Sequence, residues 1–181
     1  FEEARRELAV ARNAEGVNRA AMMLEAAEAE LLSGDRDAAQ QHFRDVAEAE
    51  VSELAFLRNL WLAVGAAVGV LDIHDSDRAN ADSSTHGPIN EYFRRRFDVA
   101  LVEAELRRGN VRKAVRRARR LVKECRSSGF AGIEVEALEF QAAALAEMGK
   151  PRSQSVAEEA ATLADRLGRS VIAARIRSRS P

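Results

Sequence analysis

Apolar residues recur along most of this chain at spacings of three and four positions, the period of an amphipathic helix. Leucine, valine and alanine carry the pattern, and no run of alternating β-branched or aromatic residues indicates a strand. Glycines follow several of the periodic segments, where helices are expected to end. The pattern therefore predicts an all-α chain of eight or nine helices, at about residues 2–13, 17–32, 36–49, 52–71, 89–108, 110–126, 132–148, 152–167 and 169–177.

Segments far apart in the chain share one motif. Both "EAAEAELLSGDRDAAQQHF" (25–43) and "ALVEAELRRGNVRKAVRRA" (100–118) read E-A-E-L-x-x-G-D/N-x-x-x-A. A third segment, 141–160, keeps the small residues, the glycine and a following helix. Gly109 and Gly149 are 40 residues apart, and Gly34 precedes Gly109 by 75 residues, close to twice that spacing. A period of this length indicates helical repeats.

The repeat divides the chain into antiparallel helix hairpins. We expect hairpins at about 15–50, 52–88, 89–127 and 131–167, a terminal helix at 169–177, and residues 1–14 as the end of a preceding unit. The second helix of the 52–88 unit is missing or degenerate. Because one hairpin cannot bury its apolar face alone, the hairpins are expected to stack as a single right-handed superhelical domain over residues 1–181.

The repeat resembles the tetratricopeptide repeat, in which small residues, a turn glycine, an alanine and an aromatic recur at these positions. The positions are Ala27, Gly34, Ala39 and Phe43 in the first unit, Val102, Gly109, Ala114 and Ala118 in the third, and Ala142, Gly149, Gln154 and Glu158 in the fourth. The second helix of the fourth unit departs from the pattern, and the tryptophan, tyrosine and inter-repeat proline of the family are missing. The resemblance implies a tetratricopeptide-like binding module.

The longer period and phrases such as "AATLADRLGRSVIAARIR" (160–177) resemble the helical-repeat regions of MalT-type bacterial regulators, the signal-transducing ATPases of the LuxR family. This resemblance implies a part in bacterial signalling or transcription regulation, beside a nucleotide-binding and an output domain. The sequence itself holds no G-x-x-x-x-G-K-S/T phosphate loop. Since the chain begins at Phe1, we expect it to be a fragment of a larger protein.

A polar stretch, "DIHDSDRANADSSTHGP" (72–88), interrupts the helical pattern. An EF-hand loop starting at Asp75 would need glycine at its sixth position and glutamate at its twelfth, but Asn80 and His86 stand there. His74 and His86 are twelve residues apart, which does not favour zinc. We expect a solvated loop over 72–86, with a partner-docking loop and a metal site as the alternatives.

The missing helix leaves the apolar helix at 52–71 without its usual partner. Its side chains Leu60, Trp61, Val64 and Val68 need cover from other parts of the chain or from another molecule. If this surface is exposed, it is a candidate partner site. A small-molecule sensor with its ligand near Trp61, or under the polar stretch, is the corresponding alternative.

Charge is distributed unevenly along the chain. Residues 94–126 hold thirteen basic against four acidic side chains, about +9, whereas residues 1–55 hold six basic against thirteen acidic, about −7. The basic helix at 110–126 suits a solvated face, an acidic protein partner or the acidic end of a second copy in a homodimer. Nucleic acid is a further alternative, weakened because no aromatic residues interleave with the arginines to stack on bases.

The expected stacking orders the candidate binding residues. First helices would line a concave groove with Glu28, Arg96, Glu103, Arg107 and Glu139, and the convex surface would carry Arg112, Arg116 and Arg120. With Trp61, these residues form the predicted partner-binding set. The carboxylates are expected to line a groove or link repeats rather than to catalyse.

The remaining chemistry of the sequence is sparse. Cys125 lies on an apolar stripe and is expected to be a buried thiol in a cytoplasmic protein. The apolar run 61–71 is far shorter than the roughly 20 residues of a membrane span. We expect no catalytic residues, cofactor, metal or membrane, and predict a non-catalytic module that binds a partner protein, a peptide or a neighbouring domain.

Overall fold

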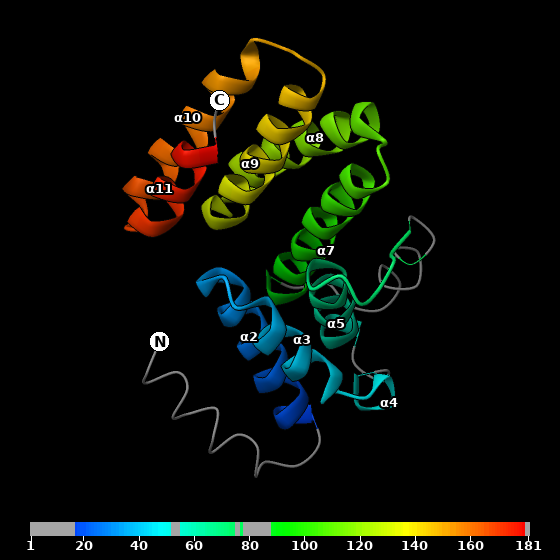
Figure 1. The fold of residues 1–181 in the computed structure, drawn as a ribbon. Coiled ribbons are helices and arrows are strands. Elements are labelled where there is room, and N and C mark those ends of the chain that lie inside the picture. The colour runs from blue at the N-terminus through cyan, green and yellow to red at the C-terminus, as the bar shows by residue number, and fades with distance from the viewer. Residues whose placement is uncertain (1–16, 52–54, 75–76, 78–87, 180–181) are drawn as a thin grey trace. The chain divides into compact units, whose positions relative to one another are not determined.

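The structure, a computed structural model, describes residues 17–51, 55–74, 77 and 88–179. All regular secondary structure within these ranges is α-helical, so the predicted all-α class is confirmed there (Figure 1). The predicted helix at 2–13 lies outside the described residues. The helices are α2 (Val17–Ser33), α3 (Arg36–Arg44), α4 (Glu48–Val51), α5 (Ala55–Ala67), α7 (Pro88–Arg107), α8 (Val111–Ser128), α9 (Ala131–Glu147), α10 (Arg152–Arg166) and α11 (Ser170–Arg179).

The chain divides into two compact units, Phe1–Ala100 and Leu101–Pro181, and the division falls inside α7. In the first unit α2 packs on α3, and both contact α5. In the second unit α9 packs between α8 and α10, and α11 packs on α10. The single stacked array over both units stays a prediction.

In the core of the first unit, α2 and α3 cover the apolar helix α5. Leu60 and Val64 of α5, and Val68 in the turn that follows α5, are at most 2% exposed, and Trp61 is 9% exposed. The Trp61 ring stacks on Phe43 of α3 at a centroid distance of 5.4 Å. Residues of α2 and α3 join the same cluster, and Phe93 packs against it. Of the two expected kinds of cover, the one from other parts of the chain is observed, because neighbouring helices bury this surface.

The predicted helix at 36–49 is broken. α3 ends at Arg44 and α4 begins at Glu48, where Glu50 Oε2 accepts the Ala47 N–H at 2.7 Å, as in a capping box. Arg19 of α2 donates to the Asp45 carbonyl and to Glu50 Oε1, each at 2.9 Å. The break is held by an arginine from another helix, which the local apolar spacing does not reveal.

The helix predicted to end at Leu71 ends instead at Ala67. Gly69 takes a positive φ of 82°, and the Val70 and Leu71 N–H groups both donate to the Gly65 carbonyl at 2.9 Å. The carbonyls left free at the helix end accept from α3: Arg36 Nη2 reaches Ala67 and Gln40 Nε2 reaches Val68, at 3.0 and 2.9 Å. Side chains of α3 thus satisfy the last turn of α5.

Little of the polar stretch 72–88 is described. Residues 72–74 are non-helical, as expected, with Asp72 and His74 exposed and Ile73 buried at 1%. The His74 N–H donates to Asp77 Oδ2 at 2.7 Å. Asp77 is helical; at most a short helical turn is expected in this loop, and one residue of it is seen. Residues 75–76 and 78–87 lie outside the described part, so the loop expected over 72–86 stays a prediction there.

The same turn closes α2, α7, α9 and α10. In each, a glycine with positive φ donates its N–H to the carbonyl three residues back, and the next N–H donates to the carbonyl five residues back at 2.9 Å. These are the two hydrogen bonds of a Schellman motif, which favours glycine at its left-handed position. The four glycines are Gly34, Gly109, Gly149 and Gly168. The helix ends predicted from the repeat are therefore confirmed.

Alanines give the second unit its close helix packing. Ala118 of α8, Ala144 of α9 and Ala160 of α10 are fully buried, as is Cys125, which confirms the expected buried thiol. Ala39 and Ala114, the repeat alanines that follow the turn glycines, are also fully buried. Small side chains at these positions let helix backbones approach closely.

Glu105 lies four residues before Gly109, in the motif shared by 25–43 and 100–118. It is a buried carboxylate, 2% exposed. Burial by itself raises the pKa of this carboxyl. The hydrogen bonds from Lys113 Nζ at 2.6 Å and Asn110 Nδ2 at 2.9 Å, with the charges of Lys113 and Arg117, outweigh burial, and the net pKa lies below its ordinary value. The ionised form therefore stabilises the fold.

Stability of the second unit is expected to fall in acid through Glu105. Because its folded pKa is lowered, its contribution is fully present above the unfolded pKa of about 4.3 and is lost as pH falls through the folded pKa. Glu105→Gln removes that charge, so we expect a loss of roughly 1 kcal/mol at neutral pH and a smaller decline below about pH 5. Urea unfolding followed by circular dichroism at several pH values measures both.

The control for this prediction is Glu147→Gln, the same substitution at an exposed glutamate of α9. It should leave both the neutral stability and the acid decline close to those of the parent chain. Parallel acid profiles for Glu105→Gln and the parent would contradict the role given to Glu105.

Candidate functional site

Two of the predicted groove residues bind each other. Arg96 of α7 donates to Glu28 of α2, with Arg96 Nε 3.0 Å from Glu28 Oε1 and Arg96 Nη2 in closer contact with the same oxygen. Both side chains are largely buried, at 18% and 20% exposed. This pair fastens α2 to α7 within the first unit, so a ligand there would have to compete with an internal ion pair.

The other predicted groove residues are also paired. Glu103 and Arg107 form a weak contact one turn apart on α7, at 3.9 Å. Glu139 of α9 accepts from Arg175 Nη2 of α11 at 2.8 Å and contacts Arg179 Nη1 at 3.4 Å. The structure thus brings Glu139 to the arginines of α11, a grouping that the sequence did not predict.

Trp61, predicted as a partner-binding residue, is in the core of the first unit. Its ring stacks on Phe43 and its exposed fraction is 9%. An exposed apolar surface, the condition for a partner site around Trp61, is therefore not met, because α3 covers the ring.

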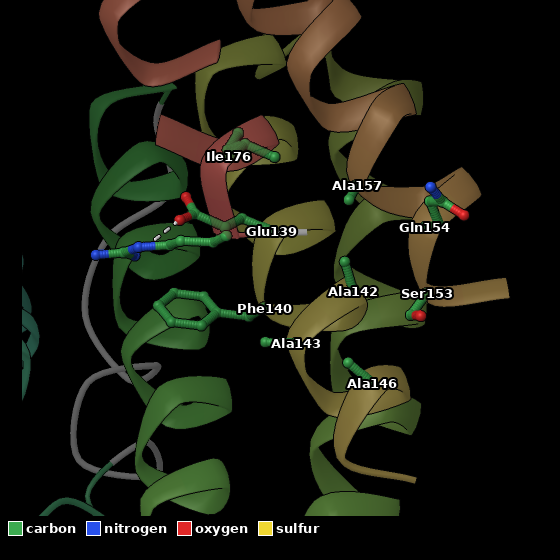
Figure 2. Close-up of a pocket in the computed structure, with 10 residues that line it drawn as sticks. Glu139, Phe140, Ala142, Ala143, Ala146, Ser153, Gln154, Ala157 and Ile176 are labelled. Carbon is green, nitrogen blue, oxygen red and sulfur yellow. Dashed lines mark hydrogen bonds and ion pairs between the residues drawn. The ribbon is translucent and has the colours of Figure 1, made fainter. Parts of the chain in front are cut away.

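A small apolar pocket opens between α9, α10 and α11, beside Glu139. Its volume is about 130 Å³. Figure 2 shows Ala142 and Ala146 of α9 beside Ser153 and Ala157 of α10, with Ile176 of α11 near Glu139. The full lining is Glu139, Phe140, Ala142, Ala143, Ala146, Ser153, Gln154, Ala157, Ile176 and Arg179. Alanine side chains leave a groove that larger ones would fill.

Glu139 and its ion-pair partner Arg179 carry the charge at the rim of this pocket. Arg175 is one-third exposed in its side chain and Arg179 is 69% exposed. Ala143 and Ala146 are exposed on the same helix. The pocket therefore combines an apolar, small-residue interior with a rim that holds the Glu139 carboxylate and the Arg179 guanidinium.

This groove was not predicted from the sequence, although α9 carries a signal for it. Its sequence, AGIEVEALEFQAAALAE, is apolar on nearly every face. A helix that is apolar all round is normally buried on several sides. Here Phe140 is half-buried and Ala143 is exposed, so part of this apolar surface faces an open groove.

The predicted basic surface lies on α8, where Arg112, Arg116 and Arg120 are all exposed, as expected. Arg120 contacts Glu124 at 3.8 Å one turn later. Arg112 and Arg116 have no carboxylate partner in the part of the chain that the structure describes. An acidic protein, a second copy and nucleic acid all stay predictions for this surface.

No group of three or more histidine, cysteine, aspartate or glutamate side chains is placed within the described ranges to hold a metal ion. The shifted pKa values belong to ion pairs: hydrogen bonding to Arg94 lowers the pKa of Glu91, and hydrogen bonding to Glu134 raises the pKa of Arg126. These shifts reflect helix-to-helix links and pairs within one helix.

Comparison with known proteins gives no relative: no family model, no curated protein and no solved structure matches this chain. Among the described helices, none has the length and apolar character to cross a bilayer. The function must therefore be argued from the surfaces themselves.

Proposed function

We propose that this chain is a non-catalytic binding module that holds a segment of a partner protein in the groove between α9, α10 and α11. The observation that carries the proposal is the size and lining of the pocket in that groove. A volume of about 130 Å³ is close to that of cavities that accept one benzene-sized group. Small-molecule sites usually occupy about 300–1,000 Å³, so a single apolar side chain of a partner fits better.

The lining of the groove supports the same proposal. Ala143 and Ala146 project little, so the backbone of a bound segment can approach α9 closely while its anchor side chain enters the pocket. Buried apolar anchors surrounded by polar contacts account for most of the affinity of such interfaces. Arg179, mostly exposed, can pair with a carboxylate of the partner beside the anchor.

The recurring turns support a tetratricopeptide-like module. Four glycine-ended helices with the same pair of hydrogen bonds are what a helical-hairpin repeat requires. In the regulators that the sequence resembles, such a module would act by binding. A partner segment or neighbouring domain that binds one arrangement of the parent protein better than another shifts the equilibrium between them.

Peptide selection on the immobilised full chain tests this function. We expect random-peptide display to enrich sequences with one bulky apolar residue. Ala143→Trp should lower the affinity of the enriched peptides about ten-fold or more, because the indole occupies the pocket and removes about 1.4 kcal/mol or more of binding free energy. Fluorescence anisotropy with labelled peptides measures the affinity.

Ala143→Ser is the matched control, since it adds one small polar atom at the same exposed position and should change the affinity little. Both variants should have the same melting temperature as the parent chain. Two results would count against the function: no enriched peptide, or enriched peptides that bind Ala143→Trp as tightly as the parent.

A further inference from the structure

A second pocket lies between α8 and α10 and has α9 as its floor. Its volume is about 610 Å³, within the range of small-molecule sites. Four basic side chains line it, Arg119, Lys123 and Arg126 from α8 and Arg152 from α10, against one carboxylate, Glu159. The residues lining it all belong to the second unit, and none of them lines the groove beside Glu139.

The carboxylates near this pocket are already engaged by one arginine. Arg126 Nε donates to Glu134 Oε1 at 2.6 Å, and Arg126 Nη2 donates to Glu159. Arg119, Lys123 and Arg152 are exposed and have no carboxylate partner among the residues that the structure describes. Three positive charges therefore surround the opening without neutralisation. A concave surface lined by one sign of charge concentrates oppositely charged ligands.

Gln141 places a neutral polar side chain in the pocket. It lines the pocket from α9, and its side-chain amide, which makes no hydrogen bond within the described ranges, keeps contact with solvent although the residue is only 5% exposed. The amide offers two donors and an acceptor to whatever enters the pocket.

The floor of the pocket is apolar. Val122, Leu138 and Val156 come from the three helices and are each at most 6% exposed. The pocket therefore combines a cationic rim, one neutral polar group and an apolar base. An inorganic ion would use only the rim, whereas an organic anion would use all three.

We propose that this pocket binds a small organic anion, a metabolite bearing phosphate or carboxylate groups. Arg119, Lys123 and Arg152 would hold the anionic group, as guanidinium and ammonium groups hold phosphates and carboxylates elsewhere. Gln141 hydrogen-bonds a polar group of the ligand, and the rest of the ligand lies on the valine and leucine floor. This binding is separate from the partner groove and does not depend on it.

Isothermal titration calorimetry of the full chain tests the site, with phenyl phosphate as the phosphate probe and citrate as the carboxylate probe. We expect at least one probe to bind, with affinity falling as the salt concentration rises from about 0.05 M to about 0.3 M. Arg152→Gln and Lys123→Gln should each weaken binding about ten-fold. Gln141→Leu should weaken citrate binding several-fold if citrate is the probe that binds.

Arg112→Gln is the matched control. Arg112 is exposed on α8, the helix that also carries Lys123, and it has no carboxylate partner in the described part. It does not line the pocket. Its removal should leave the affinity unchanged. Absence of binding by both probes at low salt would overturn the proposal. Equal weakening in Arg112→Gln and Arg152→Gln would overturn it too, since it would indicate diffuse attraction to the basic helix.

Discussion

Phe43→Ala is expected to lower the free energy of unfolding of the first unit by about 3–5 kcal/mol. Phe43 is 3% exposed, and its ring stacks on Trp61 at 5.4 Å with an interplanar angle of 29°. Truncation removes the buried ring, leaves a cavity beside Trp61 and abolishes the aromatic contact, which alone contributes about 0.5–1.5 kcal/mol. A loss of this size is a large part of the 5–15 kcal/mol by which whole domains are typically stable.

The single tryptophan makes this prediction easy to measure. Trp61 belongs to the first unit, so urea unfolding followed by its fluorescence reports on that unit alone. Phe43→Leu is the control, because it keeps most of the buried apolar volume and should lose less than about 1.5 kcal/mol. A fluorescence midpoint that is the same in Phe43→Ala and the parent would show that α3 does not cover Trp61.

Gly65→Ala is expected to destabilise the first unit by about 1–2 kcal/mol, although alanine is normally the better helix residue. The helix preference of alanine contributes about 1 kcal/mol in favour. Against it, a Cβ atom at Gly65 would lie 2.5 Å from Phe43 Cζ and 2.6 Å from Leu71 Cδ1. Overpacking a filled core typically costs about 1–3 kcal/mol and occasionally more. Because Phe43 is held against Trp61, we expect the packing cost to exceed the gain in helix preference.

Gly132→Ala provides the matched substitution with the opposite expected sign. Gly132 lies in α9, and the three atoms nearest to a Cβ there would all belong to the guanidinium of Arg169, with Nη2 at 3.0 Å. Arg169 is exposed and can move away, so the helix preference should prevail and the second unit should gain up to about 1 kcal/mol. Urea unfolding followed by circular dichroism compares the two variants. Stabilisation by Gly65→Ala would contradict the packing described around Phe43.

Helix ends were predicted well wherever the deciding interaction is local. Gly34, Gly109, Gly149 and Gly168 close their helices by hydrogen bonds to carbonyls within five residues. A short-range pattern contains all the participants in such a turn, so the sequence alone predicts it. The buried face of α8, with Ala114 and Cys125, was predicted for the same reason, since it depends on helical periodicity.

The wrong predictions in the first unit share a different cause. The break after Arg44 is held by Arg19, and the end of α5 is capped by Arg36 and Gln40, each from a helix distant in sequence. The burial of Trp61 likewise depends on Phe43 of α3. Apolar spacing within one helix says which face is buried, but not which neighbour buries it.

The candidate sites follow the same division. The sequence identified charged residues of the correct type, but Glu28 and Arg96 proved to be partners of each other. Neither the alanine-lined groove beside Glu139 nor the pocket above Gln141 was predicted. Each is formed by three helices, and the side chains that line it are brought together only by the packing of those helices.

The sequence by itself determined the helical class, the glycine turns and the amphipathic faces, because these depend on interactions among residues within one or two helical turns. Only the tertiary structure decided that α3 covers Trp61, that α11 pairs with Glu139, and that Gln141, Arg119 and Arg152 line one pocket. These features depend on contacts between separate helices, and such contacts have no signature in the spacing of residues along one helix.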